Sequence, residues 1–247
     1  MAPRPDLRLP LAALLLVALA APLGAPRWQR AAVEPNLAYD GQFTFVRLRY
    51  TNFGPPGWAY DYPAMERNFM DVLHALTSVD PHRHGSNILT MDDPALFDYP
   101  VAYLSEPGYW APSVEEAAGL RRWLERGGFL IVDDFLLDQW IPFEAAMRRV
   151  LPWARIIPLD VSHPIFDSFF RLETLDGLHH PGRSYAVARY FGIFDRNDPD
   201  ERLMVIVNYN NDIGDYMEWS GEGWYPVNLS NDAYKLATNY IVYGLTR

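Results

Sequence analysis

The chain has 247 residues, a formal net charge of -10, and compositions of 49% hydrophobic and 15% aromatic residues. Its zero cysteines exclude disulfides, thiolate metal sites and a cysteine nucleophile. The acidic balance argues against nucleic acid and anionic membrane surfaces as partners, because phosphate binding needs a basic patch that the sequence does not show.

Residues 1–25 have the pattern of an export signal peptide. Arg4 and Arg8 precede an apolar run over residues 9–23, which is shorter than the roughly 20 residues that a spanning helix needs. Cleavage is therefore favoured, and an uncleaved anchor is the alternative. We expect the rest of the chain to be exported to the periplasm or cell envelope of a bacterium.

Residues 26–40 contain two prolines and no periodicity, which predicts an extended linker. Beyond them, apolar strands alternate with amphipathic helices in a single domain over residues 41–247. The expected strands are 42–50, 86–91, 99–105, 128–135, 154–159, 185–194 and 202–209, and the expected helices are 63–76 with Asp61 as a possible cap, 113–126 with Ser113 as its cap, 140–150 and 230–245.

This alternation predicts an α/β fold with a doubly wound, mostly parallel sheet. If the strand order is flavodoxin-like, 2-1-3-4-5, a ligand crevice opens at the carboxyl ends of the first and third strands. The loops at these ends are residues 51–62 and 105–110.

Several strings are similar to those of one bacterial family: "FTFVRLRY", Trp58 with the following "DYP", "GGFLIVDDF", "MRRVLP", "SHPIF" and "KLATNYIVYGL". From about Gly41 to Leu245 the chain resembles the domain of unknown function 4159. The resemblance implies a flavodoxin-like fold of the class I glutamine amidotransferase type, and it implies no established reaction or cofactor. In larger members the domain is often attached to membrane-anchored regions.

Amidotransferases of this fold hold a cysteine in a G-x-C-x-G turn after a central strand. When this turn is aligned with "LSEPG" at residues 104–108, Glu106 takes the place of the nucleophile. Ser105 is a weak alternative nucleophile, because no G-x-S-x-G surrounds it. Glu106 would act as an acid, a base or a ligand for a cation, or it is simply a solvated turn residue.

Asp133 and Asp134 lie at the carboxyl end of the apolar stretch 128–132 of their strand. Adjacent residues of an extended strand point to opposite faces, so at most one of them is expected to face the crevice. The functional interpretation is a general base or a hard-metal ligand acting with Glu106. The structural alternatives are a cap for the next segment and an ion network with Arg47 and Arg49.

The histidines are less specific, because zinc would need three ligands that no spacing in the sequence joins. The pairs His82 and His84, and His179 and His180, are interpreted as solvated loop residues. His163 in "SHPIF" is a candidate acid–base partner for a carboxylate, although fixing a loop is the favoured role. No metal site and no cofactor are expected.

The two predicted crevice loops gather aromatic and polar side chains. Aromatic faces with a few polar groups suit saccharides or peptides, and packing of the loop over the sheet is the alternative. The candidate ligand-binding residues are Asn52, Trp58, Tyr60, Asp61, Tyr109 and Trp110.

The favoured hypothesis is a non-catalytic ligand-binding or envelope-assembly module with a degenerate amidotransferase-like crevice. Its partner would be an envelope protein or a saccharide or peptide ligand. The alternative is a periplasmic hydrolase or transferase that uses Glu106, Asp133 or Asp134, together with His163. Carboxylates that converge near His163 would favour the enzyme, whereas covered and salt-bridged carboxylates would favour binding.

Overall fold

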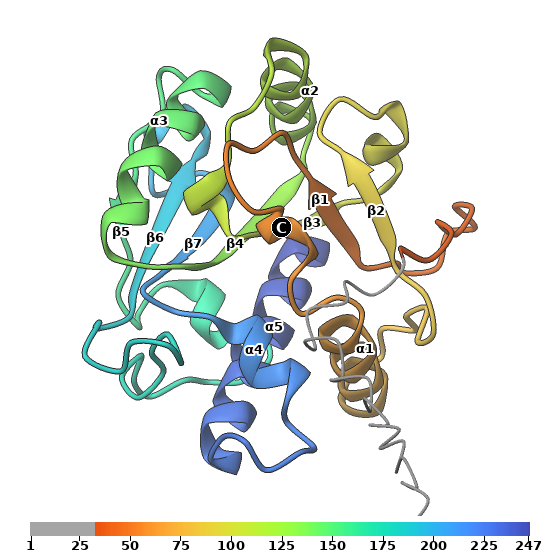
Figure 1. Cartoon of the computed structure of the whole chain (residues 1–247), viewed down its shortest axis with the longest axis vertical. Helices are drawn as coiled ribbons and strands as arrows, with labels where there is room; N and C mark the ends of the chain where they lie inside the picture. Colours follow the sequence, from red (N-terminus) through yellow and green to blue (C-terminus); the bar gives the residue numbers. More distant parts are fainter. Residues whose placement is uncertain (1–32) are drawn as a thin grey trace, which may run out of the picture. The chain divides into compact units, whose positions relative to one another are not determined.

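A sheet of seven strands in the order β2-β1-β3-β4-β7-β6-β5 forms the centre of the computed structural model, which describes residues 33–247 (Figure 1). The strands are β1 (Val46–Arg49), β2 (Asn87–Thr90), β3 (Val101–Ser105), β4 (Phe129–Phe135), β5 (Ile157–Pro158), β6 (Arg189–Phe194) and β7 (Leu203–Tyr209). β6 runs antiparallel to both β5 and β7, and the other neighbouring strands are parallel. The predicted signal peptide and the first part of the predicted linker lie outside the described residues.

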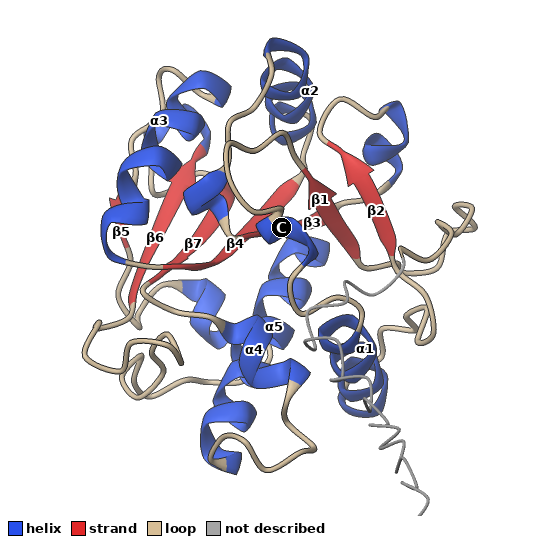
Figure 2. Ribbon diagram, in the orientation of Figure 1, coloured by secondary structure: helices blue, strands red, loops and turns tan. Residues whose placement is uncertain are grey.

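Helices cover both faces of this sheet (Figure 2). One face carries α2 (Val114–Glu125) and α3 (Trp140–Val150), and the other carries α1 (Ala64–Leu76), α4 (Ile213–Glu218) and α5 (Val227–Thr246). Alternate side chains of the central strands belong to the hydrophobic cores on the two faces of the sheet. On β3, Leu104 lies in the core beneath α2 and α3, and Tyr103 lies in the core beneath α1, α4 and α5. The predicted α/β fold with a mostly parallel sheet is confirmed.

The structure differs from the predicted elements mainly in its last third. The expected strand 154–159 is reduced to Ile157 and Pro158 at the sheet edge, where a proline without an N–H is tolerated. Helix α4 was not expected, since six residues are too few to show a helical period. None of the helices within residues 33–247 is both long and apolar enough to cross a bilayer.

Residues 33–40 form no helix or strand and follow the outer edge of β2. The side chain of Asn36 accepts from the backbone N–H of Ile88 at 2.8 Å and donates to its carbonyl at 3.0 Å. In return, the side chain of Asn87 accepts from the N–H of Leu37 and donates to its carbonyl. This part of the predicted linker is therefore bonded to the sheet.

The start of α2 confirms the predicted cap. The hydroxyl of Ser113 accepts from the N–H of Glu116 at 3.1 Å, and the carboxylate of Glu116 accepts from the N–H of Ser113 at 2.8 Å. These reciprocal bonds satisfy two backbone donors that the helix itself leaves unpaired.

Replacing this cap should have a modest and local effect. Ser113→Ala is expected to lower the free energy of unfolding by about 1 kcal/mol, because the N–H of Glu116 loses its acceptor. Urea denaturation measures the change. The matched control is Ser78→Ala, at an exposed serine, for which we expect a change within about 0.5 kcal/mol. Equal losses in both variants would contradict the role of the cap.

Candidate functional site

Carboxyl groups from four segments gather at the carboxyl ends of β1, β3, β4 and β7. The charge of one member raises the pKa of another throughout this group, so each member interacts with at least one other. We call the group the carboxylate cluster; its members are Asp61, Glu106, Asp134, Asp212, Asp215 and Glu218. It lies beyond the carboxyl ends of the strands, where ligands of open α/β sheets bind.

Asp61 enters the cluster from the loop between β1 and α1. Its backbone is left-handed, with φ 63°, and its carbonyl accepts from the N–H of Met65 at the start of α1. The expected side-chain cap does not form, because the carboxyl group points to the cluster and α1 has no side-chain cap bond. The Oδ2 atom of Asp61 is buried and accepts no hydrogen bond from any described residue.

Glu106 follows β3 in a tight turn, with a left-handed φ of 52°. Its N–H donates to the carbonyl of Asp133, and its own carbonyl accepts from the hydroxyl of Tyr50 at 2.7 Å. Only glycine fits opposite, because a β-carbon on Gly57 would lie 2.3 Å from that of Glu106. Burial, and then the charge of Asp134, raise the pKa of Glu106 to about 9. Glu106 thus faces another carboxylate, and no arginine within residues 33–247 is paired with it.

Asp133 is fully buried and supports the fold. It accepts from the hydroxyl of Tyr103, from the side-chain amide of Asn208, and from the N–H groups of Ile213 and Gly214 at the start of α4. Burial and the neighbouring carboxylate raise its pKa to about 6, although these hydrogen bonds lower it. Asp133 therefore ties β3, β7 and α4 to β4.

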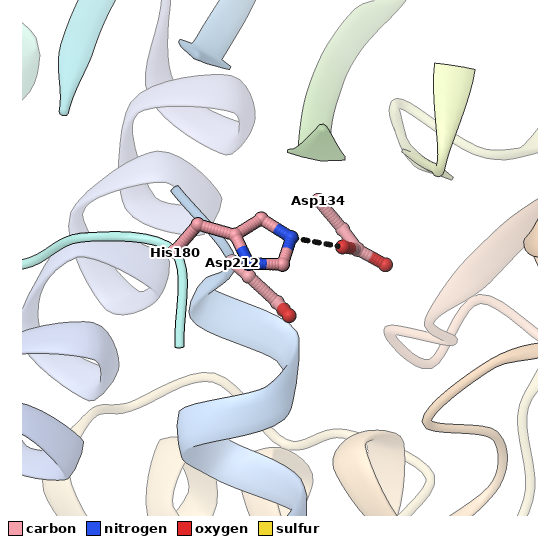
Figure 3. Close-up of side chains that lie close together, drawn as sticks. All are labelled: Asp134, His180 and Asp212. Atoms are coloured by element: carbon pink, nitrogen blue, oxygen red, sulfur yellow. Dashed lines mark ion pairs between the residues drawn. The ribbon is translucent and has the colours of Figure 1, made fainter. Parts of the chain in front are cut away.

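The side chain of Asp134 points in a different direction from that of Asp133, because β4 changes register after Val132 and Asp134 has a positive φ of 61°. Its Oδ2 accepts from the hydroxyl of Ser105 at 3.2 Å, and its Oδ1 lies 3.3 Å from Nε2 of His180 (Figure 3). Ser105 is completely buried, so its hydroxyl is inaccessible to a substrate.

His180 was expected to be a solvated loop residue, but its side chain is only 16% exposed and lies against Asp134. Its Nδ1 accepts from the N–H of Gly182 at 3.1 Å. Because Nδ1 is an acceptor, the ring proton lies on Nε2, the nitrogen that faces Asp134. His180 thus orients a carboxylate of the cluster.

Helix α4 supplies the members that the sequence analysis missed. Asp212 caps the helix, with its Oδ1 accepting from the N–H of Asp215 at 2.8 Å. Asp215 and Glu218 are three residues apart and share one helix face. The Oδ2 of Asp215 also accepts from the hydroxyl of Tyr225 at 2.6 Å. The regular spacing of three acids, at 212, 215 and 218, is a signal that could have been found.

Two sets of side chains in this region offer possible metal-ligand atoms within 4.8 Å of one another. One set is Asp134, His180 and Asp212, and the other is Asp61, Asp215 and Glu218. Burial first, and then neighbouring carboxylates, raise the pKa of Asp61 and of Asp212 well above the usual range. The same causes raise the pKa of Glu218 to about 7. Such an arrangement favours a proton or a cation among the oxygens.

The predicted ion network has different partners from those expected. Arg47 is completely buried, and its Nε lies 2.5 Å from Oε1 of Glu66 on α1. Its Nη1 donates to the carbonyls of Trp58 and Tyr60, which anchors the loop after β1. Arg47 forms no ion pair with Glu106, Asp133 or Asp134 among the pairs of the described residues.

The predicted aromatic set divides between core and surface. Trp110 is 1% exposed and belongs to the core beneath α2 and α3, against which Trp58 also packs. The side chain of Asn52 donates to loop carbonyls. Tyr60 is 40% exposed, and Tyr109 lies against the exposed ring of Phe53. Tyr60 and Tyr109 therefore remain candidates for ligand contact, whereas Trp110 is held in the core.

His163 lies at the opposite end of the sheet. It packs against Phe194, which pairs with Leu203 at the amino end of β7. Its Nδ1 accepts from the N–H of Ile165, so it fixes the start of the turn 164–167. It also borders a cavity of about 670 Å³. His163 cannot form an acid–base pair with the carboxylate cluster in this structure.

These features define an α/β protein with a mostly parallel seven-stranded sheet and an acidic edge at the carboxyl ends of its strands. Comparison with protein families matches residues 44–245 to a domain of unknown function, DUF4159. The chain belongs to this family, as the sequence resemblance indicated. A search among curated proteins found no match.

Proposed function

We propose that this chain is an exported, non-catalytic binding module of the cell envelope whose carboxylate cluster takes a cationic ligand. The observation that carries the proposal is the excess of negative charge at one place. Among the described residues, the ion pair of Asp134 with His180 is the only one that a cluster member makes. Arg47 is paired with Glu66, and although its charge lowers the pKa of Asp61 and of Glu218, both pKa values remain raised.

The fold is proposed to be flavodoxin-like, of the glutamine amidotransferase type. Support comes from the order β2-β1-β3-β4-β7, which is 2-1-3-4-5 when β7 is counted as the fifth parallel strand. In this alignment Glu106 stands where an amidotransferase holds its cysteine. An acid at this place suits capture of a cation rather than nucleophilic attack.

Binding is favoured over catalysis by the state of the candidate catalytic groups. Ser105 is buried, Asp133 accepts hydrogen bonds that hold α4 in place, and His163 lies at the other end of the sheet. No nucleophile within residues 33–247 is seen hydrogen-bonded to a histidine base in the cluster. The rings of Tyr60 and Tyr109 are partly exposed, and a larger ligand would contact them.

Isothermal titration calorimetry with a panel of cations tests the proposal. The panel contains calcium chloride, magnesium chloride, spermidine and arginine methyl ester, with glucose as the neutral comparison. We expect at least one cation to bind, and Glu218→Gln to weaken that binding at least tenfold. The control Glu173→Gln removes a carboxylate that is 85% exposed and outside the cluster. If no cation binds, or if both variants bind alike, the proposal is wrong.

The second candidate is a hydrolase or transferase, favoured by the proximity of Glu106 to Asp134. Glu106, with a pKa of about 9, keeps its proton at neutral pH and would be a general acid. We expect no turnover of chromogenic amide or glycoside substrates by the full chain. Turnover that Glu106→Gln abolishes without lowering Tm would establish the enzyme instead.

A further inference from the structure

We infer that the ligand of the carboxylate cluster is one hard divalent metal ion, of the Mg²⁺ or Ca²⁺ class, held by Asp61, Asp215 and Glu218. This inference rests on the proposed cation-binding function and specifies its ligand. It is carried by the geometry of the three carboxylates, by the unpaired buried oxygen of Asp61, and by the chemistry of the neighbouring histidine.

The three carboxylates are placed as ligands of a single ion. Their oxygens lie within 4.8 Å of one another, and two oxygens on opposite sides of a Ca²⁺ ion are separated by about twice a bond of 2.4 Å. The carbonyl of Asp61 is held by Met65, and that of Glu218 accepts from the side chain of Asn68 at 3.0 Å. Both anchors lie on α1, so the ligands come from fixed elements.

One carboxylate of the ligand set has an oxygen that the protein does not satisfy. The Oδ2 of Asp61 is buried and accepts no hydrogen bond from the described residues. A buried carboxylate oxygen without a donor is costly, so this oxygen indicates a positively charged ligand.

The space around Asp61 favours a metal ion over an organic cation. The backbone of α4 packs directly on the carboxylate, since a β-carbon on Gly214 would lie 2.8 Å from Oδ2 of Asp61. The hydroxyl of Tyr103 lies on the same side, 2.9 Å from that β-carbon position. An ion coordinated through single oxygen bonds fits beside such close atoms, whereas an ammonium or guanidinium group with its carbon chain needs an open cavity.

The class of metal follows from the ligand atoms. Carboxylates alone suit Mg²⁺ and Ca²⁺, whereas Zn²⁺ prefers histidine or thiolate ligands. The neighbouring His180 is not a ready ligand, because its Nδ1 accepts from the N–H of Gly182 and its Nε2 carries the ring proton and faces Asp134. A metal ion on Nε2 would move the ring proton to Nδ1. The contact with Asp134 and the hydrogen bond from Gly182 would then both be lost. The set Asp134, His180 and Asp212 is therefore assigned to orientation and not to the metal.

Equilibrium dialysis of the full chain, against calcium, magnesium or zinc chloride at pH 7.5 with elemental analysis of the protein, tests the inference. We expect about one equivalent of Ca²⁺ or Mg²⁺ per chain and weaker binding of Zn²⁺. Asp61→Asn and Glu218→Gln should each weaken binding at least tenfold. The exposed control Glu173→Gln should retain it within about twofold. Equal binding by Asp61→Asn would overturn the assignment.

Thermal unfolding shows whether the variants fold. Each acid-to-amide variant removes repulsion inside the cluster, so in EDTA its Tm should equal or exceed that of the original chain. The original chain should gain about 5 °C or more at a hundredfold excess of Ca²⁺ over Kd, and Asp61→Asn should not. If spermidine or arginine methyl ester binds but no metal does, the metal is wrong and the cation-binding function stands. If nothing binds, both are wrong.

Discussion

In EDTA, the free energy of unfolding is expected to fall as the pH rises from about 5 to about 9. Glu106 has a pKa of about 9 and Asp133 of about 6 in the folded chain, whereas unfolded carboxyl groups titrate near 4. The folded state therefore binds these protons more tightly. The stability that this contributes is fully present below the unfolded pKa, and it is lost as the pH rises through the folded pKa.

The loss should be large for a single region. Each pKa unit corresponds to about 1.4 kcal/mol. Glu106 is partly accessible, so solvent screening reduces its share, and we expect a fall of about 2 kcal/mol or more between pH 6 and pH 8.5. The charge of Asp134 contributes to both of these raised pKa values, and the raised pKa of Asp61 acts in the same direction.

Guanidinium denaturation at a series of pH values measures the slope. Glu106→Gln keeps the shape of the side chain without its charge, so it should flatten the profile above pH 7. Glu173→Gln, at an exposed carboxylate, should leave the profile unchanged. A stability that rises steadily with pH in this range would show that Glu106 is ionised and paired in solution.

Glu66→Gln is expected to destabilise the chain by about 3–5 kcal/mol. The substitution leaves the guanidinium of Arg47 completely buried and without its counter-charge, which is the costly way to break a buried ion pair. Arg47 also donates to the carbonyls of Trp58 and Tyr60, so a displaced guanidinium would release the loop that carries Asp61. Chemical denaturation gives the loss of stability.

A double-mutant cycle makes this prediction specific. Arg47→Met with Glu66→Gln removes both charges, so the double variant should be more stable than Glu66→Gln alone. The surface pair of Arg196 and Glu201 is the matched control, because its side chains are 71% and 40% exposed. Glu201→Gln should cost less than about 1 kcal/mol. Similar costs for Glu66→Gln and Glu201→Gln would contradict the importance of burial.

Local sequence patterns predicted the parallel sheet and three of the six members of the carboxylate cluster. Continuous apolar strands separated by amphipathic helices indicated the parallel arrangement, and placed Asp61, Glu106 and Asp134 after β1, β3 and β4. Strand alternation also indicated that only one carboxylate of Asp133 and Asp134 would be free for a site. The structure agrees, because Asp133 is bonded to Tyr103 and to the start of α4.

The rest of the cluster depends on contacts between distant segments. Asp212, Asp215 and Glu218 reach the site because β7 lies next to β4, although β5 and β6 come between them in the chain. His180 arrives from a long irregular loop, in which no periodicity indicates direction. His163 does not reach the cluster, because it packs against Phe194, which lies beside Leu203 at the amino end of β7.

The hydrogen bonds between residues 33–40 and β2 also affect whether copies of the protein can associate through the edges of their sheets. An open edge strand can recruit the edge of another molecule and begin aggregation. Here the side chain of Asn36 takes both outward-facing backbone groups of Ile88, in the place of a neighbouring strand. The opposite edge ends in β5, which is two residues long and includes Pro158. Both edge strands are therefore protected from pairing with a strand of another molecule. We expect the protein to resist edge-to-edge aggregation at high concentration.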